Sequence, residues 1–425
     1  MKTLDQIAAE LQGYDPNALP ADAVDEFLSR LVEPLTQTER VGLFDALDRV
    51  LAADLIAPLN VPPHDNSAMD GYAFAGSQLR AGQDLRLRVV GTAYAGAAWQ
   101  GEVGPGQCVK IMTGAVMPAG LDTVVPVEFT RSEGETVTLP AGCVQPGDNR
   151  RLLGEDLMAG QPALLAGSRL GPAALGLIAS LGLAEVAVWR RPKVAFFSTG
   201  DEILSLGQAP REGAVYDSNR YTLFGLLTRL GVEPIDLGSV KDDPASLEAA
   251  FRRAAAQADV VISSGGVSVG EADHTKAIMK QLGDVAFWRI AMRPGRPMAV
   301  GRLQQEGRSA LLFGLPGNPV AVMVTFLAFV RPALLRLMGA RQAQPLRVPA
   351  LSQEAVRKKP GRTEFQRGIA SRALDGSLQV RSTGSQGSGV LRSMAEANCL
   401  IRLDHEQGKV AIGDRVELLL FDGLI

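Results

Sequence analysis

The chain has 425 residues, 46% of them apolar, which is enough to bury several hydrophobic cores and predicts about three domains. Its 43 Lys and Arg and 46 Asp and Glu give a net charge of −3, so no overall positive field would attract nucleic acid or an anionic membrane. The three cysteines form no CxxC pair and the N-terminus has no apolar run, so we expect a cytoplasmic protein without a disulfide framework.

Two amphipathic helices are expected near the N-terminus, at 21–33 and 39–53, because apolar residues recur there with a helical period. Residues 58–150 instead contain short β-type runs between glycine-rich turns, which predicts a β-rich domain. A further helix is expected at 172–182, where small apolar residues return. We therefore predict that the β-rich domain is inserted into a discontinuous, elongated helical and linker domain formed by residues 1–57 and 151–189.

Residues 190–340 alternate apolar strands with helices, the pattern of a three-layer domain with a parallel sheet and crossover helices. Strands are expected at KVAFFS, VEPIDLG, DVVISS, DVAFWRI, PMAVGRL and SALLFG, and helices at 219–230, 244–257, 273–282 and from 319. Residues 341–425 have short strands and turns, which predicts a small C-terminal β-barrel-like domain. The expected fold class is therefore multidomain α/β plus β.

One window, Ser309 to Val330, is uncharged and long enough to span a membrane. The sequence LPGNP interrupts it with two prolines and two nearby glycines. This pattern favours a strand, a tight loop and a buried helix, so no membrane span is expected.

Ligands of parallel α/β sheets bind beyond the carboxyl ends of the strands, and four such ends here carry polar or glycine-rich loops. Three carboxylates, Glu202, Asp242 and Asp273, follow different strands, and hard oxygen ligands beside a phosphate site suit Mg²⁺. Taken singly, Asp242 or Asp243 is a helix N-cap instead, and the SGGVSVG loop is an ordinary glycine-rich turn. The loop residues expected to bind a phosphate-bearing ligand are Thr199, Gly200, Ser264, Gly265, Gly266, Ser268, Gly270, Pro316, Gly317, Asn318 and Pro319.

Arg293 and Arg296 lie in the segment WRIAMRPGRP, where prolines hold the chain extended and the two side chains can converge. Guanidinium forks suit oxyanions, and the alternative is a solvated basic turn. Near the tail, EFQRG and STGSQGSG offer one arginine, Arg367, and a group of hydroxyls; each alone is a hairpin turn. The segment DNSAMDGY is an Asx-turn loop when taken alone.

Ten segments together resemble a known family. In order they are PPHDNSAMDGYA, KIMTGAVMPAGLDTVVPVE, RLLGEDL, FFSTGDEI, DSNRY, SSGGVSVGEADHTK, AMRPGRPMAVG, LPGNPVAVMVTF, EFQRG and TGSQGSGVL. They are similar to the molybdopterin molybdotransferase family, which is related to the E domain of gephyrin, and the resemblance covers the chain from about residue 20 to the end.

The resemblance implies a four-domain subunit and a homodimer whose cleft lies between the α/β domain of one subunit and the β domains of the other. It implies that molybdate enters adenylylated molybdopterin while the phosphoanhydride is hydrolysed with Mg²⁺ and AMP is released. Molybdopterin adenylyltransferase and molybdoenzyme acceptors are the implied partners. Matching positions imply catalytic roles for Asp70, Asp156, Glu202, Asp242 and Asp273, pterin binding by Thr113, and molybdate binding by Arg293, Arg296, Arg367 and Ser388.

One segment departs from the family pattern, because Arg293-Pro294-Gly295-Arg296-Pro297 stands where Lys-Pro-Gly-Lys-Pro is common. The charge is kept, but the geometry and hydration of the cations differ. Three other functions compete. Molybdopterin adenylylation would not need the extra β-rich segments, a gephyrin-like scaffold with a vestigial site would not need the intact carboxylates, and a dehydrogenase would need the GxGxxG motif that is missing.

Overall fold

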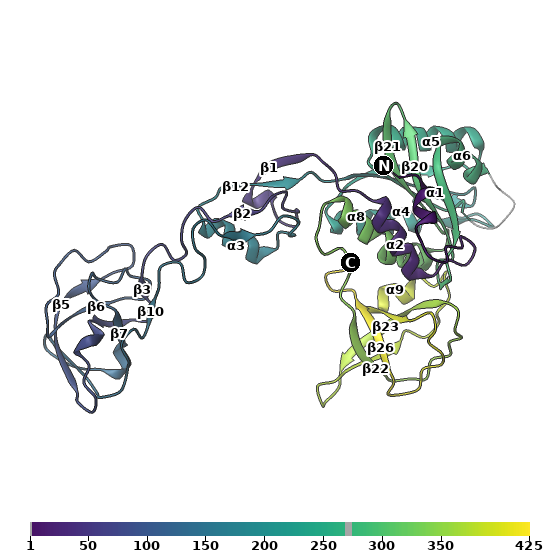
Figure 1. Ribbon diagram of the computed structural model, residues 1–425. Helices are drawn as coiled ribbons and strands as arrows, with labels where there is room; N and C mark the ends of the chain where they lie inside the picture. The colour runs from purple at the N-terminus through teal and green to yellow at the C-terminus, as the bar shows by residue number, and fades with distance from the viewer. Residues whose placement is uncertain (1, 268–273) are drawn as a thin grey trace.

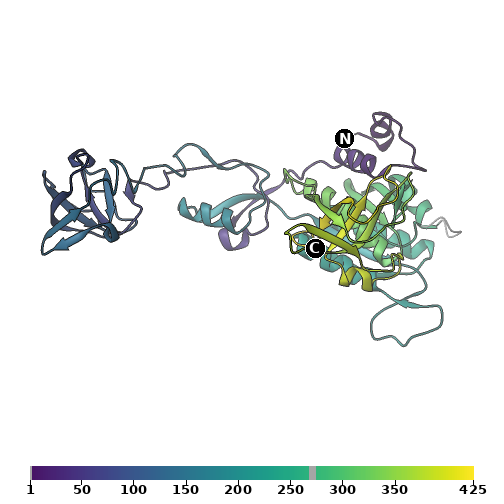
Figure 2. The same ribbon diagram turned by 90° about the horizontal axis from the view of Figure 1, so that it is seen from below.

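The computed structural model describes residues 2–267 and 274–425. The described chain forms a body, built from the N-terminal and C-terminal parts of the sequence, and an arm that extends away from it (Figures 1 and 2). The arm has two parts, a linker next to the body and a β-rich lobe at its far end, called the distal lobe below.

The N-terminal helices belong to the body. Helix α1 spans Leu4–Ala9 and α2 spans Ala21–Leu31, which confirms the helix expected at 21–33. Phe27 of α2 packs edge-on against Trp288, with ring centroids 4.9 Å apart, inside the largest hydrophobic core. The assignment of residues 1–57 to the linker domain is therefore wrong for its first part, because the buried face of α2 has its partners in the α/β layer.

The linker is a small β structure rather than a helical one. Strand β1 (Thr38–Gly42) pairs antiparallel with β12 (Glu185–Trp189) and leads into the short 3₁₀ helix η1 (Leu43–Asp45). The helix expected at 39–53 is therefore wrong: its apolar residues pack across this ribbon, and Asp48 has a left-handed φ of 62° that no helix continues through. The remaining linker elements are β2 (Leu55–Ile56), β11 (Pro162–Leu164) and α3 (Pro172–Ser180), the last of which confirms the helix expected at 172–182.

The distal lobe is built on a six-stranded sheet in the order β7-β4-β6-β5-β9-β8. Its two faces bury separate apolar clusters, one around Phe74 and Val125 and one around Val109 and Val124. The bounds are β3 (Asn66–Ser67), β4 (Gly71–Phe74), η2 (Gly76–Gln78), β5 (Leu85–Ala93), β6 (Gln107–Ile111), β7 (Thr123–Pro126), η3 (Val127–Phe129), β8 (Arg131–Glu133), β9 (Thr136–Leu139) and β10 (Arg150–Arg151).

The body contains a six-stranded sheet in the order β16-β13-β17-β21-β20-β18. The first four strands are parallel, but β20 runs antiparallel to both of its neighbours, so the expectation of a wholly parallel sheet is wrong at this edge. The reason is local, because β20 and β21 are joined by a tight turn at Glu306-Gly307 rather than by a crossover helix. The strands are β13 (Lys193–Thr199), β16 (Glu233–Val240), β17 (Val260–Ser264), β18 (Gly283–Arg289), β20 (Pro297–Gln305) and β21 (Arg308–Leu315), with a small pair β14 (Ile203–Leu204) and β15 (Val215–Tyr216).

Helices cover both faces of this sheet. On one face lie α5 (Pro244–Gln257) and α6 (His274–Leu282), and on the other lies α4 (Ser218–Leu230) with α7 (Pro319–Thr325). Helix α7 continues through a π-helical turn, η4 (Phe326–Val330), into α8 (Arg331–Leu337). This stretch, Pro319–Leu337, is long and apolar enough to cross a membrane, but 83% of its most apolar window is buried in the body, as in the core helix of a soluble protein.

A closed β-barrel completes the body, which confirms the small C-terminal barrel expected from the sequence. Pairing of β23 with both β24 and β25 closes the sheet on itself. A short strand from the α/β part, β19 (Met292–Arg293), pairs with β23 and joins the two units. The barrel elements are β22 (Val348–Ser352), β23 (Thr363–Arg372), β24 (Leu378–Ser382), α9 (Arg392–Glu396), β25 (Cys399–Leu403) and β26 (Arg415–Leu420).

Candidate functional site

A cavity of about 590 Å³ lies where the carboxyl ends of the parallel strands meet the barrel, and we call it the main cavity. The four loops expected from the sequence converge on it, those after β13, β16, β17 and β21. The barrel contributes the facing wall. The expected site residues that line it are Thr199, Gly200, Glu202, Asp242, Gly265, Gly266, Arg293, Arg296, Pro316, Gly317, Asn318 and Ser388.

Glycines let the loops approach one another at the floor of the main cavity. Gly265 has φ 96°, and a Cβ there would lie 2.5 Å from the carbonyl oxygen of Thr199. Gly266 has φ 68°, and a Cβ there would lie 2.5 Å from the hydroxyl of Thr275. A larger residue at Gly265 would push the loop away from the end of β13, and one at Gly266 would push it away from α6, so the glycine-rich loop is required by packing as well as suited to phosphate.

Two of the three expected metal carboxylates enter the main cavity. Glu202 is exposed and folds back over Gly200, where a Cβ would meet its Oε2 at 2.4 Å. Oδ1 of Asp242 is buried and accepts no hydrogen bond. Its neighbour Asp243 is the N-cap of α5, accepting a 2.9 Å bond from the backbone N–H of Ser246, so the N-cap alternative holds for Asp243 alone.

The third carboxylate, Asp273, and the loop residues Ser268 and Gly270 lie outside the described residues. Among the residues that are described, no group of three His, Cys, Asp or Glu side chains is arranged to hold a metal. Glu202 and Asp242 nevertheless fit a hard cation, because both carboxylates line a polar cavity and Oδ1 of Asp242 has no hydrogen-bond partner; carboxylate oxygens are the donors that Mg²⁺ takes, with substrate oxygens or water completing its shell.

The two arginines of the RPGRP segment are exposed on the main cavity, at the junction between sheet and barrel. Arg293 belongs to β19 and is paired in register with Glu364 of β23. Gly295 between them has φ 96°, and a Cβ there would lie 2.5 Å from Cγ2 of Thr325. The backbone of the segment is therefore packed on α7, and both of its arginines line the cavity.

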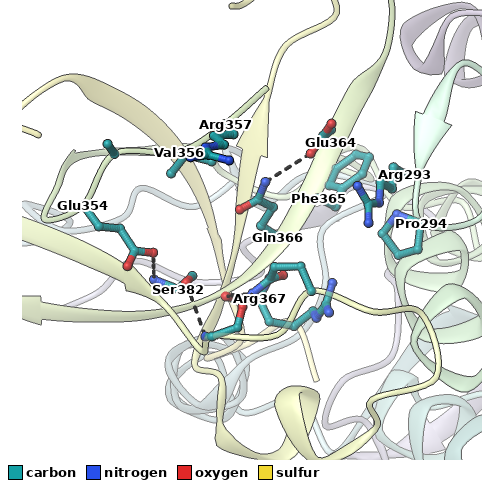
Figure 3. Close-up of a pocket in the computed structure, with 13 residues that line it drawn as sticks. Arg293, Pro294, Glu354, Val356, Arg357, Glu364, Phe365, Gln366, Arg367 and Ser382 are labelled. Atoms are coloured by element: carbon teal, nitrogen blue, oxygen red, sulfur yellow. Dashed lines mark hydrogen bonds between the residues drawn. The ribbon is translucent and has the colours of Figure 1, made fainter. Parts of the chain in front are cut away.

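Arg367 lies in a second, smaller cavity of about 360 Å³ in the barrel, which shares Arg293, Pro294 and Gln386 with the main cavity. Figure 3 shows Arg293 on the α/β side of this cavity and Arg367 on the barrel strand. Arg367 is only 1% exposed, and it donates hydrogen bonds to Ser393 Oγ at 3.0 Å and to the Gly387 carbonyl at 3.0 Å. Burial, together with the charge of Arg293, lowers the pKa of Arg367 to about 10.

The expected oxyanion residues are therefore split between two connected spaces. Arg296 and Ser388 line the main cavity, Arg367 lines the smaller one, and Arg293 lines both. Within the described residues Arg367 has no carboxylate partner. A buried cation held only by neutral groups is poised for an anion, since a charge-assisted bond would offset its lost hydration.

Two expected residues of the body, Ser264 at the end of β17 and Pro319 at the start of α7, do not line the main cavity. The expected residues of the N-terminal motifs lie on the arm, away from the body in the same chain (Figure 1). Asp70 accepts bonds from the backbone N–H of Thr113 at 2.6 Å and from its hydroxyl at 2.7 Å, and these bonds lower the pKa of the Asp70 carboxyl. Asp156 is exposed where the linker joins the distal lobe, and its N–H donates to the Val61 carbonyl at 3.1 Å. One chain does not bring these three residues to the main cavity.

A buried polar network beneath the main cavity was not predicted from the sequence. Asp217 is 2% exposed and accepts hydrogen bonds from the hydroxyls of Ser198 at 2.8 Å and Ser239 at 2.9 Å. Asn219 donates from Nδ2 to the Gly317 carbonyl at 2.7 Å. The motif DSNRY contains both residues. Nothing in a sequence, however, shows that the aspartate that caps a helix also accepts hydrogen bonds from serines of two neighbouring strands.

Comparison with known proteins gives matches along most of the chain. Three family models match in order: "MoeA N-terminal region (domain I and II)" at 20–182, "Probable molybdopterin binding domain" at 195–336 and "MoeA C-terminal region (domain IV)" at 349–421. A Haemophilus influenzae protein named molybdopterin molybdenumtransferase is 43% identical over 407 residues, covering 95% of this chain and 99% of that protein. A Nostoc protein of the same name is 39% identical, covering 90% of this chain and 88% of its own.

The fold also matches solved structures. A molybdopterin biosynthesis moeA protein from Pyrococcus horikoshii superposes with a TM-score of 0.81 at 27% identity, covering 95% of this chain and all of that one. A second structure of the protein from the same organism gives 0.72 at 29% identity. The match therefore extends over the body and the arm together.

Proposed function

Because this chain belongs to the molybdopterin molybdenumtransferase family, we propose that it inserts molybdenum into molybdopterin in the biosynthesis of molybdenum cofactor. One observation carries the proposal: the main cavity combines a glycine-rich anion-binding floor, two carboxylates and two exposed arginines. These are the groups needed to hold a phosphorylated pterin and an oxyanion side by side.

We propose further that the pterin arrives adenylylated and that the phosphoanhydride is hydrolysed to AMP as the metal is inserted. The floor around Gly265 and Gly266 would bind the phosphates, because residues without side chains let an anion approach the backbone closely. Glu202 and Asp242 would hold Mg²⁺, which neutralises charge on the phosphate oxygens. The arginines would fix molybdate next to the pterin.

Molybdate would be positioned by Arg293, which faces both cavities. Its exposed guanidinium can present parallel N–H donors to an oxyanion in the main cavity, and Arg296 and Ser388 can complete the shell. Buried Arg367 adds a positive charge behind Arg293 without entering the main cavity. The smaller cavity would thus attract molybdate toward the junction of sheet and barrel.

We also propose that the active unit is a homodimer in the cytoplasm, with molybdopterin adenylyltransferase and molybdoenzymes as partners in substrate delivery and cofactor transfer. The dimer is supported by the position of Asp70 and Thr113 on an arm that points away from its own body. The linker also exposes apolar side chains, with Phe44 fully accessible and Leu47 and Ile56 nearly half exposed. A second copy covering these groups would remove them from water.

The test is a reconstituted reaction. The full chain is incubated with adenylylated molybdopterin, molybdate and Mg²⁺, and AMP release and molybdenum incorporation are measured together. We expect both products in equal amounts, a strong loss in Glu202→Gln, and no change in the control Glu212→Gln, whose exposed side chain does not line the main cavity. A second incubation supplies ATP and free molybdopterin in place of the adenylylated substrate. If the chain then releases pyrophosphate and incorporates no molybdenum in either incubation, it is an adenylyltransferase instead.

A further inference from the structure

A cavity of about 650 Å³ lies where the linker meets the body, and we call it the joint cavity. Its walls come from three units: residues 167–169 of the linker, α8 with the turn that follows it, and the end of β26. It shares no lining residue with the main cavity or with the smaller cavity of the barrel. Nothing in the proposed reaction uses it.

A buried arginine, Arg331, forms part of the wall. It is only 8% exposed, and among the described residues its guanidinium makes one hydrogen bond, from Nη2 to the Gly423 carbonyl at 3.2 Å. Its Nε is fully buried and has no acceptor. Among the described residues no carboxylate lies within ion-pair distance of its guanidinium, and burial together with the charge of Arg169 lowers the pKa of Arg331 to about 10.

Two more arginines line the joint cavity. Arg169 enters from the linker, where one of its nitrogens pairs with Asp48 at 3.1 Å while its Nε is buried without an acceptor. Arg341 is exposed on the turn after α8. The one acidic side chain in the described lining is the exposed Asp422, which makes no ion pair. The lining therefore carries three guanidinium groups against one carboxylate.

Holding guanidinium groups together with so little compensation is unfavourable unless an anion joins them. We propose that the joint cavity is a binding site for a small phosphate-class dianion, with Arg331 as its fixed cation and Arg169 and Arg341 closing over it. Guanidinium groups present paired N–H donors that match phosphate oxygens. Leu335 and Leu346 line the same cavity and could pack against the apolar substituent of a phosphomonoester. This binding does not depend on the proposed reaction.

The position of the site gives it a mechanical consequence. The linker and body already touch there: Arg341 N–H donates to the Gly167 carbonyl at 3.0 Å, and a Cβ on Gly167 would lie 2.4 Å from Cγ of Arg341. An anion held by Arg169 on one side and Arg331 on the other would add a second tie across the same joint. Occupancy of the joint cavity would therefore restrict the angle at which the arm carries the distal lobe.

The experiment uses the full chain with its oxyanion cavities disabled by Arg293→Ala and Arg367→Met. Inorganic phosphate and phenyl phosphate are titrated by calorimetry at constant ionic strength. We expect an anion-binding event that is at least about tenfold weaker in Arg331→Met and in Arg169→Met and unchanged in the control Arg415→Met, an exposed arginine at the far end of β26; any anion bound at the floor of the main cavity should not respond to these substitutions. Tighter binding of phenyl phosphate would identify an ester as the natural ligand, and equal binding would identify free phosphate.

Hydrogen exchange of the linker provides a second measurement. The N–H of Leu51 donates to the Ser168 carbonyl at 2.9 Å, so amides in this segment should exchange more slowly with phosphate present, and should lose that response in Arg331→Met. Absence of binding in the disabled chain would overturn the proposal, as would full binding in both Arg331→Met and Arg169→Met. If Arg331→Met instead weakens subunit association and leaves phosphate binding intact, the cavity is a contact between two copies and not an anion site.

Discussion

The side-chain amide of Asn219 donates a 2.7 Å hydrogen bond to the carbonyl of Gly317, so the first turn of α4 holds the loop between β21 and α7 at the main cavity. In Asn219→Ala this loop loses its tie, and we expect KM for the adenylylated pterin to rise about tenfold with a stability loss of about 1 kcal/mol. Steady-state kinetics and urea unfolding measure the two effects. Thr228→Ala, on the exposed side of α4, should change neither.

Asp217 ties the end of β13 to the end of β16, through the hydroxyls of Ser198 and Ser239. Asp217→Ala leaves both hydroxyls without their acceptor and also removes the cap bond from the Arg220 N–H. We expect the free energy of unfolding to fall by about 2–4 kcal/mol, measured by urea denaturation. Ser239→Ala removes one bond only and should cost about 1 kcal/mol; equal losses in the two variants would contradict a shared network.

Much of the body could be predicted from local signals. Asp243 followed by Pro244 marks the start of α5, and the structure begins the helix at that proline with Asp243 as its cap. The linker could not be predicted in this way. Val41 and Leu51 fit a helical period, but their partners are Val186 and Val188, about 140 residues away, and tertiary pairing overrode the local pattern.

The rim of the candidate site was predictable because strand ends of a parallel sheet must share an edge. Glu202, Asp242 and Gly265 follow three different strands and line one cavity. How deeply each side chain is buried could not be predicted, because burial depends on which neighbours cover that side chain in the fold. Arg367 looked like an exposed turn residue in EFQRG, yet it is 1% exposed, and nothing local marked Asp217 as buried.

Arg367 shows a conflict between stability and binding. Burial, together with the charge of Arg293, lowers its pKa to about 10, so the folded state disfavours its charge, and stability should rise as the pH increases beyond about 10, because the unfolded chain keeps the proton longer. Arg367→Met removes this buried charge. We expect unchanged or higher stability, by up to about 2 kcal/mol, measured by chemical denaturation.

The same Arg367→Met variant should bind molybdate more weakly. Loss of a charge behind Arg293 should raise the molybdate concentration for half-maximal cofactor formation about tenfold or more, at saturating pterin. Arg372→Met is the matched control, because Arg372 is exposed at the far end of the same strand, β23, and lines neither cavity. A large loss of stability in Arg367→Met, with no shift in molybdate half-saturation, would mean that Arg367 is only structural.

Asp70 and Thr113 predict a pH effect on the distal lobe. The backbone N–H of Thr113 is the largest cause of the lowered pKa of Asp70, and the Thr113 hydroxyl is the second. Thr113→Val removes the hydroxyl bond alone, so the pKa of Asp70 should rise part of the way toward its ordinary value. Carboxyl NMR titration measures the change directly, and the acid limb of the activity profile should move to higher pH. An unchanged limb would show that ionised Asp70 is not required.

Complementation can test whether each active site combines the arm of one subunit with the body of the other. If Asp70 of one subunit serves the main cavity of the other, Asp70→Ala and Glu202→Gln chains are each inactive alone. After unfolding and refolding an equal mixture, half of the dimers would contain one chain of each kind. In each such dimer the intact arm meets the intact body at one of its two sites, so the mixture should recover about one quarter of wild-type activity.

A cleft built within one chain would give no recovery, because each chain would carry its own defect. Activity of the Asp70→Ala chain by itself would remove the distal lobe from the chemistry. The AMP assay on the refolded mixture, with sedimentation to verify the dimer, distinguishes the three cases.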